Sequence, residues 1–124
     1  MLANVLAAAA GGALGAVLRY GVGLGMAGRS GFPWATLSVN VAGSLLFGLL
    51  IVWLNERVPA ANELRVFLLV GVLGAFTTFS TFSWETLVLL EQGAMLRATM
   101  NIVGSVMLCV IAAAAGAWLA RQIL

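Results

Sequence analysis

Four apolar segments, each long enough to cross a bilayer, dominate this chain of 124 residues. They run from about Leu2 to Ala27, Trp34 to Leu54, Glu63 to Glu91 and Met95 to Ile123. A stretch of about 20 mostly apolar residues is the pattern of a transmembrane helix. Hydrophobic residues make up 63% of the chain and charged residues only 8%, too few for the surface of a small soluble domain. The sequence therefore predicts an all-α integral membrane protein, with residues 1–124 forming a single four-helix membrane domain.

The third segment contains a polar run that a lipid-facing helix does not need. It reads Gly71-Val-Leu-Gly-Ala-Phe-Thr-Thr-Phe-Ser-Thr-Phe-Ser83, with five hydroxyl residues in its last seven positions. Irregular backbone at membrane depth is tolerated only where protein or a water-filled cavity covers it. We expect the third helix to break within Gly71–Thr77, near the middle of the membrane. The alternative is a kinked helix whose hydroxyls bond back to its own carbonyls.

The residues after this break suit a small anion. At 100° per residue, Phe79 and Phe82 lie about 60° apart on one side of the helix. Ser80 and Ser83 point elsewhere, and we expect them to hold the broken helix together. The positive edges of aromatic rings and the protons of hydroxyls can coordinate an anion weakly, which lets it leave again. An adjoining polar strip contains Thr78, Thr81 and Glu85.

The break also frees backbone carbonyls, which can ligate a hard cation such as Na⁺. Gly74 and Thr77 flank the expected interruption. The chain has no histidine and only one cysteine, Cys109, which makes a transition-metal site improbable. A net charge of +2 is too small and too scattered to indicate a nucleic-acid surface.

Polar residues also occur inside the other segments. Asn40 and Ser44 are four residues apart and share a face of the second helix. The same pattern returns as Asn101-Ile-Val-Gly-Ser105 in the fourth helix, a weak indication that both helices flank one polar feature. An amide at this depth faces protein or water, so Asn40 either joins helices or lines a pathway. Arg19 either extends to the nearer surface or has a buried structural or vestibule role.

The arginines carry almost no orientation signal. Three would lie on each side of the membrane: Arg57, Arg65 and Arg121 on the side of the N-terminus, and Arg19, Arg29 and Arg97 on the other. Orientation follows the asymmetry of Lys and Arg, so a balanced chain can insert both ways. Four helices also make a thin bundle around a pathway. We therefore expect a dual-topology homodimer whose two subunits are inverted relative to each other.

Four groups of residues form one pattern over essentially the whole chain. They are Gly12-x-x-Gly15-x-x-x-Arg19-Tyr20, Thr36-Leu-x-Val-Asn40-x-x-Gly43-Ser44, Gly71-x-x-Gly74-x-x-Thr77-Thr78-Phe79-Ser80-Thr81-Phe82-Ser83 with Glu85, and Gly104-Ser105. The Thr-Thr-Phe-Ser-Thr-Phe string is specific, whereas the glycine motifs alone would not be. This pattern resembles the Fluc (CrcB-type) fluoride channel family.

The resemblance implies a fluoride-selective channel, not an enzyme, that lowers cytoplasmic fluoride by passive export across the cell inner membrane. It implies an antiparallel homodimer with two fluoride pathways in the lipid bilayer. It also implies a structural Na⁺ at the dimer centre, held by main-chain carbonyls of Gly74 and Thr77. Arg19 would lie near the vestibule or stabilise the packing of the first helix. The residues expected to line or border the pathway are Asn40, Phe79, Phe82, Thr78, Thr81, Ser105 and Glu85.

One position departs from the family pattern, and two other functions compete. Relatives are expected to carry an aromatic or imidazole side chain near position 101, where this chain has Asn101. Asn101 could replace that group as a donor. A proton-coupled multidrug exporter would need a membrane-embedded carboxylate, and Glu85 is the only candidate, about two turns from its helix end. A membrane scaffold without transport would tolerate Leu and Ala throughout the Thr/Phe cluster.

Overall fold

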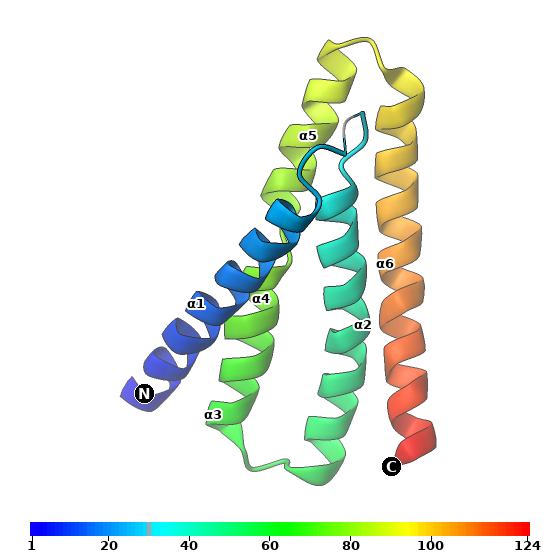
Figure 1. Ribbon diagram of the computed structural model, residues 1–124. Helices are drawn as coiled ribbons and strands as arrows, with labels where there is room; N and C mark the ends of the chain where they lie inside the picture. Colours follow the sequence, from blue (N-terminus) through cyan, green and yellow to red (C-terminus); the bar gives the residue numbers. More distant parts are fainter. Residues whose placement is uncertain (30) are drawn as a thin grey trace.

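The computed structural model describes residues 1–29 and 31–124, and its ordered elements are helices (Figure 1). Four helical stretches are long and apolar enough to cross a membrane, as the sequence predicts. The third of them is divided into four consecutive elements. The elements are α1 (Leu2–Gly25), α2 (Trp34–Arg57), α3 (Asn62–Arg65), η1 (Val66–Leu73), α4 (Gly74–Phe76), α5 (Phe79–Glu91) and α6 (Met95–Ile123).

Two helix ends differ from the sequence-based expectation. α1 ends at Gly25 and is followed by a turn in which Gly28 has a φ of 89°, a conformation that glycine adopts without strain. α2 extends past Leu54 to Arg57 in spite of the polar residues there. It stops where Val58 precedes Pro59, because a residue before proline is disfavoured in the helical region.

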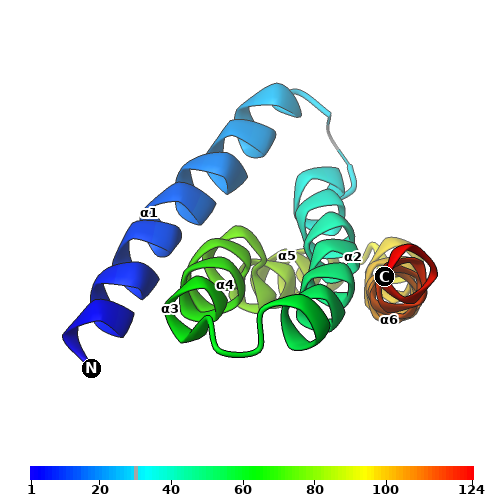
Figure 2. The same cartoon turned by 90° about the horizontal axis from the view of Figure 1, so that it is seen from below.

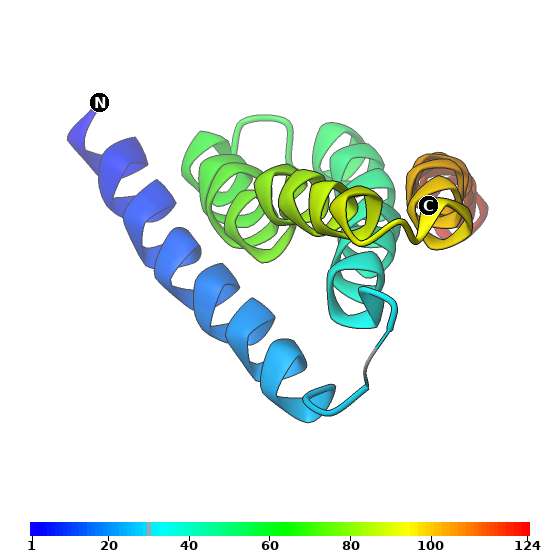
Figure 3. The ribbon, with the colours of Figure 1, turned by 90° about the horizontal axis from the view of Figure 1, so that it is seen from above.

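Small residues decide which helices approach closely. α2 packs along α6, and a Cβ added at Gly48 or Gly116 would collide with a backbone carbonyl of the facing helix. α1 packs against η1 and α4 in the same manner through Gly11 and Gly15. Seen end-on, α1 lies at one flank of the bundle and α6 at the other (Figures 2 and 3).

Only some glycines of the first helix lie in close contact with other helices of this chain. Gly11 and Gly15 meet η1, but four others have open space where a Cβ would lie. The reason is geometric, because α1 makes most of its contacts through the face that meets η1 and α4, and these four glycines lie away from that face. These four glycines are Gly12, Gly21, Gly23 and Gly25.

The third helix is interrupted as expected, at the last residue of the expected range, Thr77, and at Thr78. Residues from Asn62 to Phe76 form one helical run, which includes a π-helical portion, η1. The backbone is extended only at Thr77, with a ψ of 157°, and at Thr78, with a φ of −152°. Gly71 stays helical because its missing side chain serves the contact with Gly11 of α1 rather than an unwound backbone.

Three arginines, Arg57, Arg65 and Arg97, lie at the ends of the bundle. The N-terminus, the α2–α3 connection and the C-terminus share one end (Figure 1). There Arg57 donates to the Leu124 carbonyl at 3.0 Å, and Arg65 donates to the Leu54 carbonyl at 3.0 Å. Arg97 lies at the other end, where its guanidinium approaches Gly31.

Candidate ion site at the helix break

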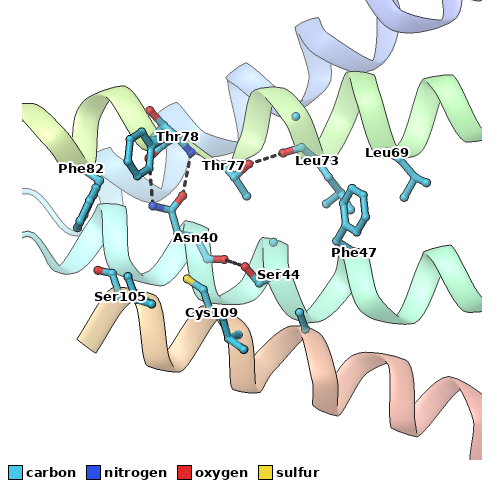
Figure 4. Close-up of a pocket in the computed structure, with 16 residues that line it drawn as sticks. Asn40, Ser44, Phe47, Leu69, Leu73, Thr77, Thr78, Phe82, Ser105 and Cys109 are labelled. Carbon is cyan, nitrogen blue, oxygen red and sulfur yellow. Dashed lines mark hydrogen bonds between the residues drawn. The ribbon is translucent and has the colours of Figure 1, made fainter. Parts of the chain in front are cut away.

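One amide side chain holds the extended backbone of the break. The Thr78 N–H donates to Asn40 Oδ1 at 2.8 Å, and Asn40 Nδ2 donates to the Thr78 carbonyl at 3.0 Å (Figure 4). Asn40 therefore satisfies both polar groups of a residue that has left the helix. This pair of bonds joins α2 to the start of α5. Ser44, one turn along α2, donates to the carbonyl of Asn40 at 2.7 Å.

The break removes the usual helical partners of several carbonyls, among them those of Gly74 and Thr77. In a continuous α-helix the N–H of residue i+4 would donate to the carbonyl of residue i, so Thr78 would serve Gly74 and Thr81 would serve Thr77. Here the Thr78 N–H donates to Asn40, and the Thr81 N–H donates to Thr78 Oγ1 at 3.2 Å as an N-cap. Gly74 is also exposed. Two carbonyl oxygens without their helical partners are the donor type that a hard cation prefers.

Hydroxyls near the break bond back to the chain. Thr77 Oγ1 donates to the Leu73 carbonyl at 2.9 Å, and Ser83 Oγ donates to the Phe79 carbonyl at 2.9 Å. Thr78 Oγ1 donates to Thr81 Oγ1 at 3.0 Å and lies 3.3 Å from the Ser80 hydroxyl. Thus Ser80 and Ser83 support the helix, as predicted, and so do the hydroxyls of Thr77 and Thr81.

An open groove of about 530 Å³ lies beside the break, between α2, the third helix and α6 (Figure 4). Its wall is mostly apolar, with a few polar groups. Asn40, Thr78 and Ser105 lie on it together with Phe79 and Phe82, so five of the predicted pathway residues meet there. Gly74 and Thr77 line it too. Lining residues that the sequence analysis did not assign to a pathway include Ser44, Phe47 and Cys109.

The two phenylalanines form a pair at one end of α5. Their ring centroids are 5.4 Å apart and the ring planes are tilted by 40°. Phe79 is 78% exposed, which is a large apolar surface for a side chain beside a polar break. The predicted common side for these two rings is therefore confirmed.

Glu85 lies outside the groove. Its Oε1 accepts a hydrogen bond from Thr36 Oγ1 at 2.9 Å, which ties α5 to the start of α2. Its Oε2 is buried without a hydrogen-bond partner among the described residues. A smaller pocket of about 310 Å³ at this end of the bundle is lined by Glu85 with Phe32 and Trp84. The strip that the helical projection assigned to Thr78, Thr81 and Glu85 is therefore divided by the packing of α2.

Asn101 and Arg19 are not in the groove wall either. Asn101 is 1% exposed and bonds to Thr86 and Ser105. Arg19 lies half-buried on α1, which touches η1 and α4 and leaves the groove to the other helices. Thr86 is a residue that the sequence reasoning missed, because its role depends on α6 lying beside α5.

These features define a helical multi-pass membrane protein whose third span is interrupted by a side-chain-supported break. The chain matches the family model described as "CrcB-like protein, Camphor Resistance (CrcB)" over residues 6–117. It therefore belongs to the CrcB family, and its four spans make it a multi-pass protein of the cell inner membrane.

Similar proteins carry the name "Fluoride-specific ion channel FluC". The chain is 50% identical over 120 residues to that of Rhizobium meliloti, with 95% of this chain and 96% of the relative covered. It is 46% identical over 125 residues to that of Geobacter sulfurreducens, with 98% and 100% covered. It is 49% identical over 122 residues to that of Methylococcus capsulatus, and this match covers 97% of this chain but only 54% of the relative.

Proposed function

We propose that this chain forms a fluoride-selective channel that lets fluoride leave the cytoplasm passively. The observation that carries the proposal is the groove at the break, where the Asn40 amide, the Ser105 hydroxyl and two phenyl rings lie on one wall. The names of the relatives indicate which ion is transported, and the lining of the groove gives a physical reason why that ion could bind there. A channel, rather than an enzyme, is what such a lining supports.

The groove offers donors without a fixed charge. Asn40 uses one amide hydrogen for the Thr78 carbonyl, which leaves its second amide hydrogen for an anion. The edges of Phe79 and Phe82 carry partial positive charge and can face the same ion. No arginine is among the described residues of the groove wall. Such a site binds weakly enough to release its ion, as conduction requires.

A second, inverted copy would close the groove. The groove is open along one side, and both Phe79 and Gly74 are exposed beside it. A polar pathway open to lipid is unfavourable, because polar groups in hydrocarbon have no water to bond. The balanced arginines at the two ends of the bundle favour insertion in both orientations. An antiparallel homodimer with two pathways satisfies both observations.

A structural Na⁺ fits between the two copies. The carbonyls of Gly74 and Thr77 have lost their helical N–H partners, and Gly74 is exposed on the side where a partner would dock. Two inverted copies would bring four such oxygens together, and carbonyl oxygens are suitable ligands for a hard cation. When bound, the cation would supply positive charge at the dimer centre. The residues of this chain that would hold it are Gly74 and Thr77.

The proton-coupled drug exporter has less support. Glu85 is its only candidate carboxylate, and Glu85 bonds to Thr36 in the smaller pocket instead of lining the groove. Exchange of protons against a cation would need that carboxylate on the transport pathway. A scaffold without transport would leave the donors of the groove without a purpose.

Efflux from liposomes tests the proposal. Purified protein is reconstituted into vesicles loaded with potassium fluoride or potassium chloride, and valinomycin starts the efflux. We expect fluoride to leave far faster than chloride, and protein-free vesicles to release neither. Equal rates for the two halides would contradict the proposed lining, and no fluoride release at all would contradict a channel.

A further inference from the structure

A chain of hydrogen bonds runs from the groove wall into the interface of α5 and α6. Ser105 Oγ donates to Asn101 Oδ1 at 3.4 Å, and Asn101 Nδ2 donates to Thr86 Oγ1 at 2.9 Å. Thr86 Oγ1 in turn donates to the Phe82 carbonyl at 2.7 Å. Asn101 is 1% exposed, so water does not compete with these bonds. Of the four residues joined by these hydrogen bonds, only Ser105 and Phe82 lie on the groove wall (Figure 4).

The direction of every proton in this chain follows from its last member. The Phe82 carbonyl can only accept, so the single proton of Thr86 is directed to it. Thr86 Oγ1 must then accept from its other neighbour, which makes Asn101 present its NH₂ group to it. Asn101 consequently presents its oxygen to Ser105, and Ser105 has to donate. The only hydroxyl proton of Ser105 therefore points away from the groove.

In this arrangement the Ser105 hydroxyl donates to Asn101 through a weak bond that is easily exchanged for another acceptor. Hydroxyl hydrogen bonds usually have lengths of about 2.5–3.0 Å, so the 3.4 Å bond to Asn101 is a weak one. An anion in the groove is a stronger acceptor than an amide oxygen, because hydrogen bonds to charged groups are roughly twice as strong. A passing anion can accept the hydrogen bond of the Ser105 hydroxyl in place of Asn101, and the hydroxyl bonds to Asn101 again when the ion leaves.

We propose that Asn101 is a positioning residue for conduction: with Thr86 it holds the Ser105 proton away from the groove and thereby weakens the binding of fluoride. It does not touch the ion. This inference rests on the proposed channel function, and it assigns Asn101 a role different from that of a pore-lining donor. Weaker binding serves conduction, because an ion that binds too tightly does not leave.

Two substitutions should free the Ser105 hydroxyl to donate to an anion in the groove, each for a different reason. Asn101→Leu removes the acceptor of the Ser105 proton. Thr86→Val removes the hydroxyl that orients Asn101, so the amide can turn and donate to Ser105 instead. In both variants fluoride no longer competes with Asn101 for the hydrogen bond that Ser105 donates. Thr99→Val on the exposed face of α6 is the matched control, because it deletes a hydroxyl from the same helix without touching this chain of bonds.

Fluoride conductance of the full-length protein in planar bilayers, measured over a series of fluoride concentrations, tests the inference. We expect the half-saturating concentration to fall by about threefold in both Asn101→Leu and Thr86→Val, the effect of a weak net hydrogen bond, and to stay constant in Thr99→Val. A merely structural defect would raise it or lower only the maximal current. An unchanged or raised half-saturating concentration in a variant that purifies as wild type would overturn the inference. If Asn101→Leu does not fold, the half-saturating concentration of Thr86→Val alone decides whether the inference holds. A wild-type protein that passes no fluoride would instead overturn the channel function.

Discussion

Replacing Asn40 with leucine should remove the support of the helix break. Leucine has nearly the same shape but can bond to neither the Thr78 N–H nor the Thr78 carbonyl, which Asn40 contacts at 2.8 and 3.0 Å. Both groups would then lie at membrane depth without these partners, where unsatisfied backbone is costly.

The size of the effect follows from those two bonds. Side-chain hydrogen bonds between membrane helices contribute on average about 0.6 kcal/mol and at most about 1.7 kcal/mol. Two short bonds to the backbone of a single residue, Thr78, therefore stabilise the broken conformation by about 1–3 kcal/mol. At about 2 kcal/mol, the ratio of the broken conformation to its unbroken competitors would fall roughly thirtyfold.

Fluoride efflux from vesicles, normalised to the reconstituted protein, measures this loss. We expect Asn40→Leu to lower the rate by at least tenfold. Ser44→Ala is the control, since it lies one turn away in the same groove and loses only a bond to the Asn40 carbonyl. We expect its rate to stay within about threefold of wild type, the effect of one weak bond. Efflux through Asn40→Leu within threefold of wild type would refute the reasoning.

Three further outcomes are expected. Gly43→Ala places a methyl group against the Cγ2 atom of Thr77, an overpacking cost of about 1–3 kcal/mol. It should therefore lower both the midpoint of thermal unfolding and the fluoride flux. Gly104→Ala, the control, has open space at its Cβ and should change neither. Phe82→Ile should elute as a folded protein in size-exclusion chromatography and conduct poorly, because it removes a ring edge from the groove, and wild-type flux in this variant would assign the pathway to other residues. An experimental structure in sodium should contain an ordered ion between two copies of the Gly74 and Thr77 carbonyls, whereas lipid or side chains at that point would argue against the cation.

The sequence predicted the broken third helix, and the break lies at the end of the expected range Gly71–Thr77 rather than at its glycines. Gly71 and Gly74 have the lowest helix propensity in this stretch, yet Gly71 stays helical because Gly11 of α1 approaches it. The break lies at Thr77 and Thr78, where a side chain from α2 replaces the missing backbone bonds. Helix propensity carries no information about such a partner 38 residues away.

The candidate site was likewise predictable only in part. Periodicity along one helix places Phe79 and Phe82 on a common side, and the structure confirms it. The same periodicity adds Glu85 to the strip, but the position of Thr36 directs this carboxylate to another pocket. The Asn/Ser repeat correctly indicated that α2 and α6 border one groove. It did not reveal that Asn101 turns toward Thr86, because that depends on how α6 faces α5.

The reversal potential of the current through single reconstituted channels examines the proposed function most directly. With fluoride salts of different concentration on the two sides and no other permeant anion, a passive fluoride channel should reverse at the fluoride equilibrium potential, about 59 mV for a tenfold gradient. Adding chloride to one side should leave that value unchanged. A reversal potential that moves with chloride or with a proton gradient would contradict a fluoride-selective channel.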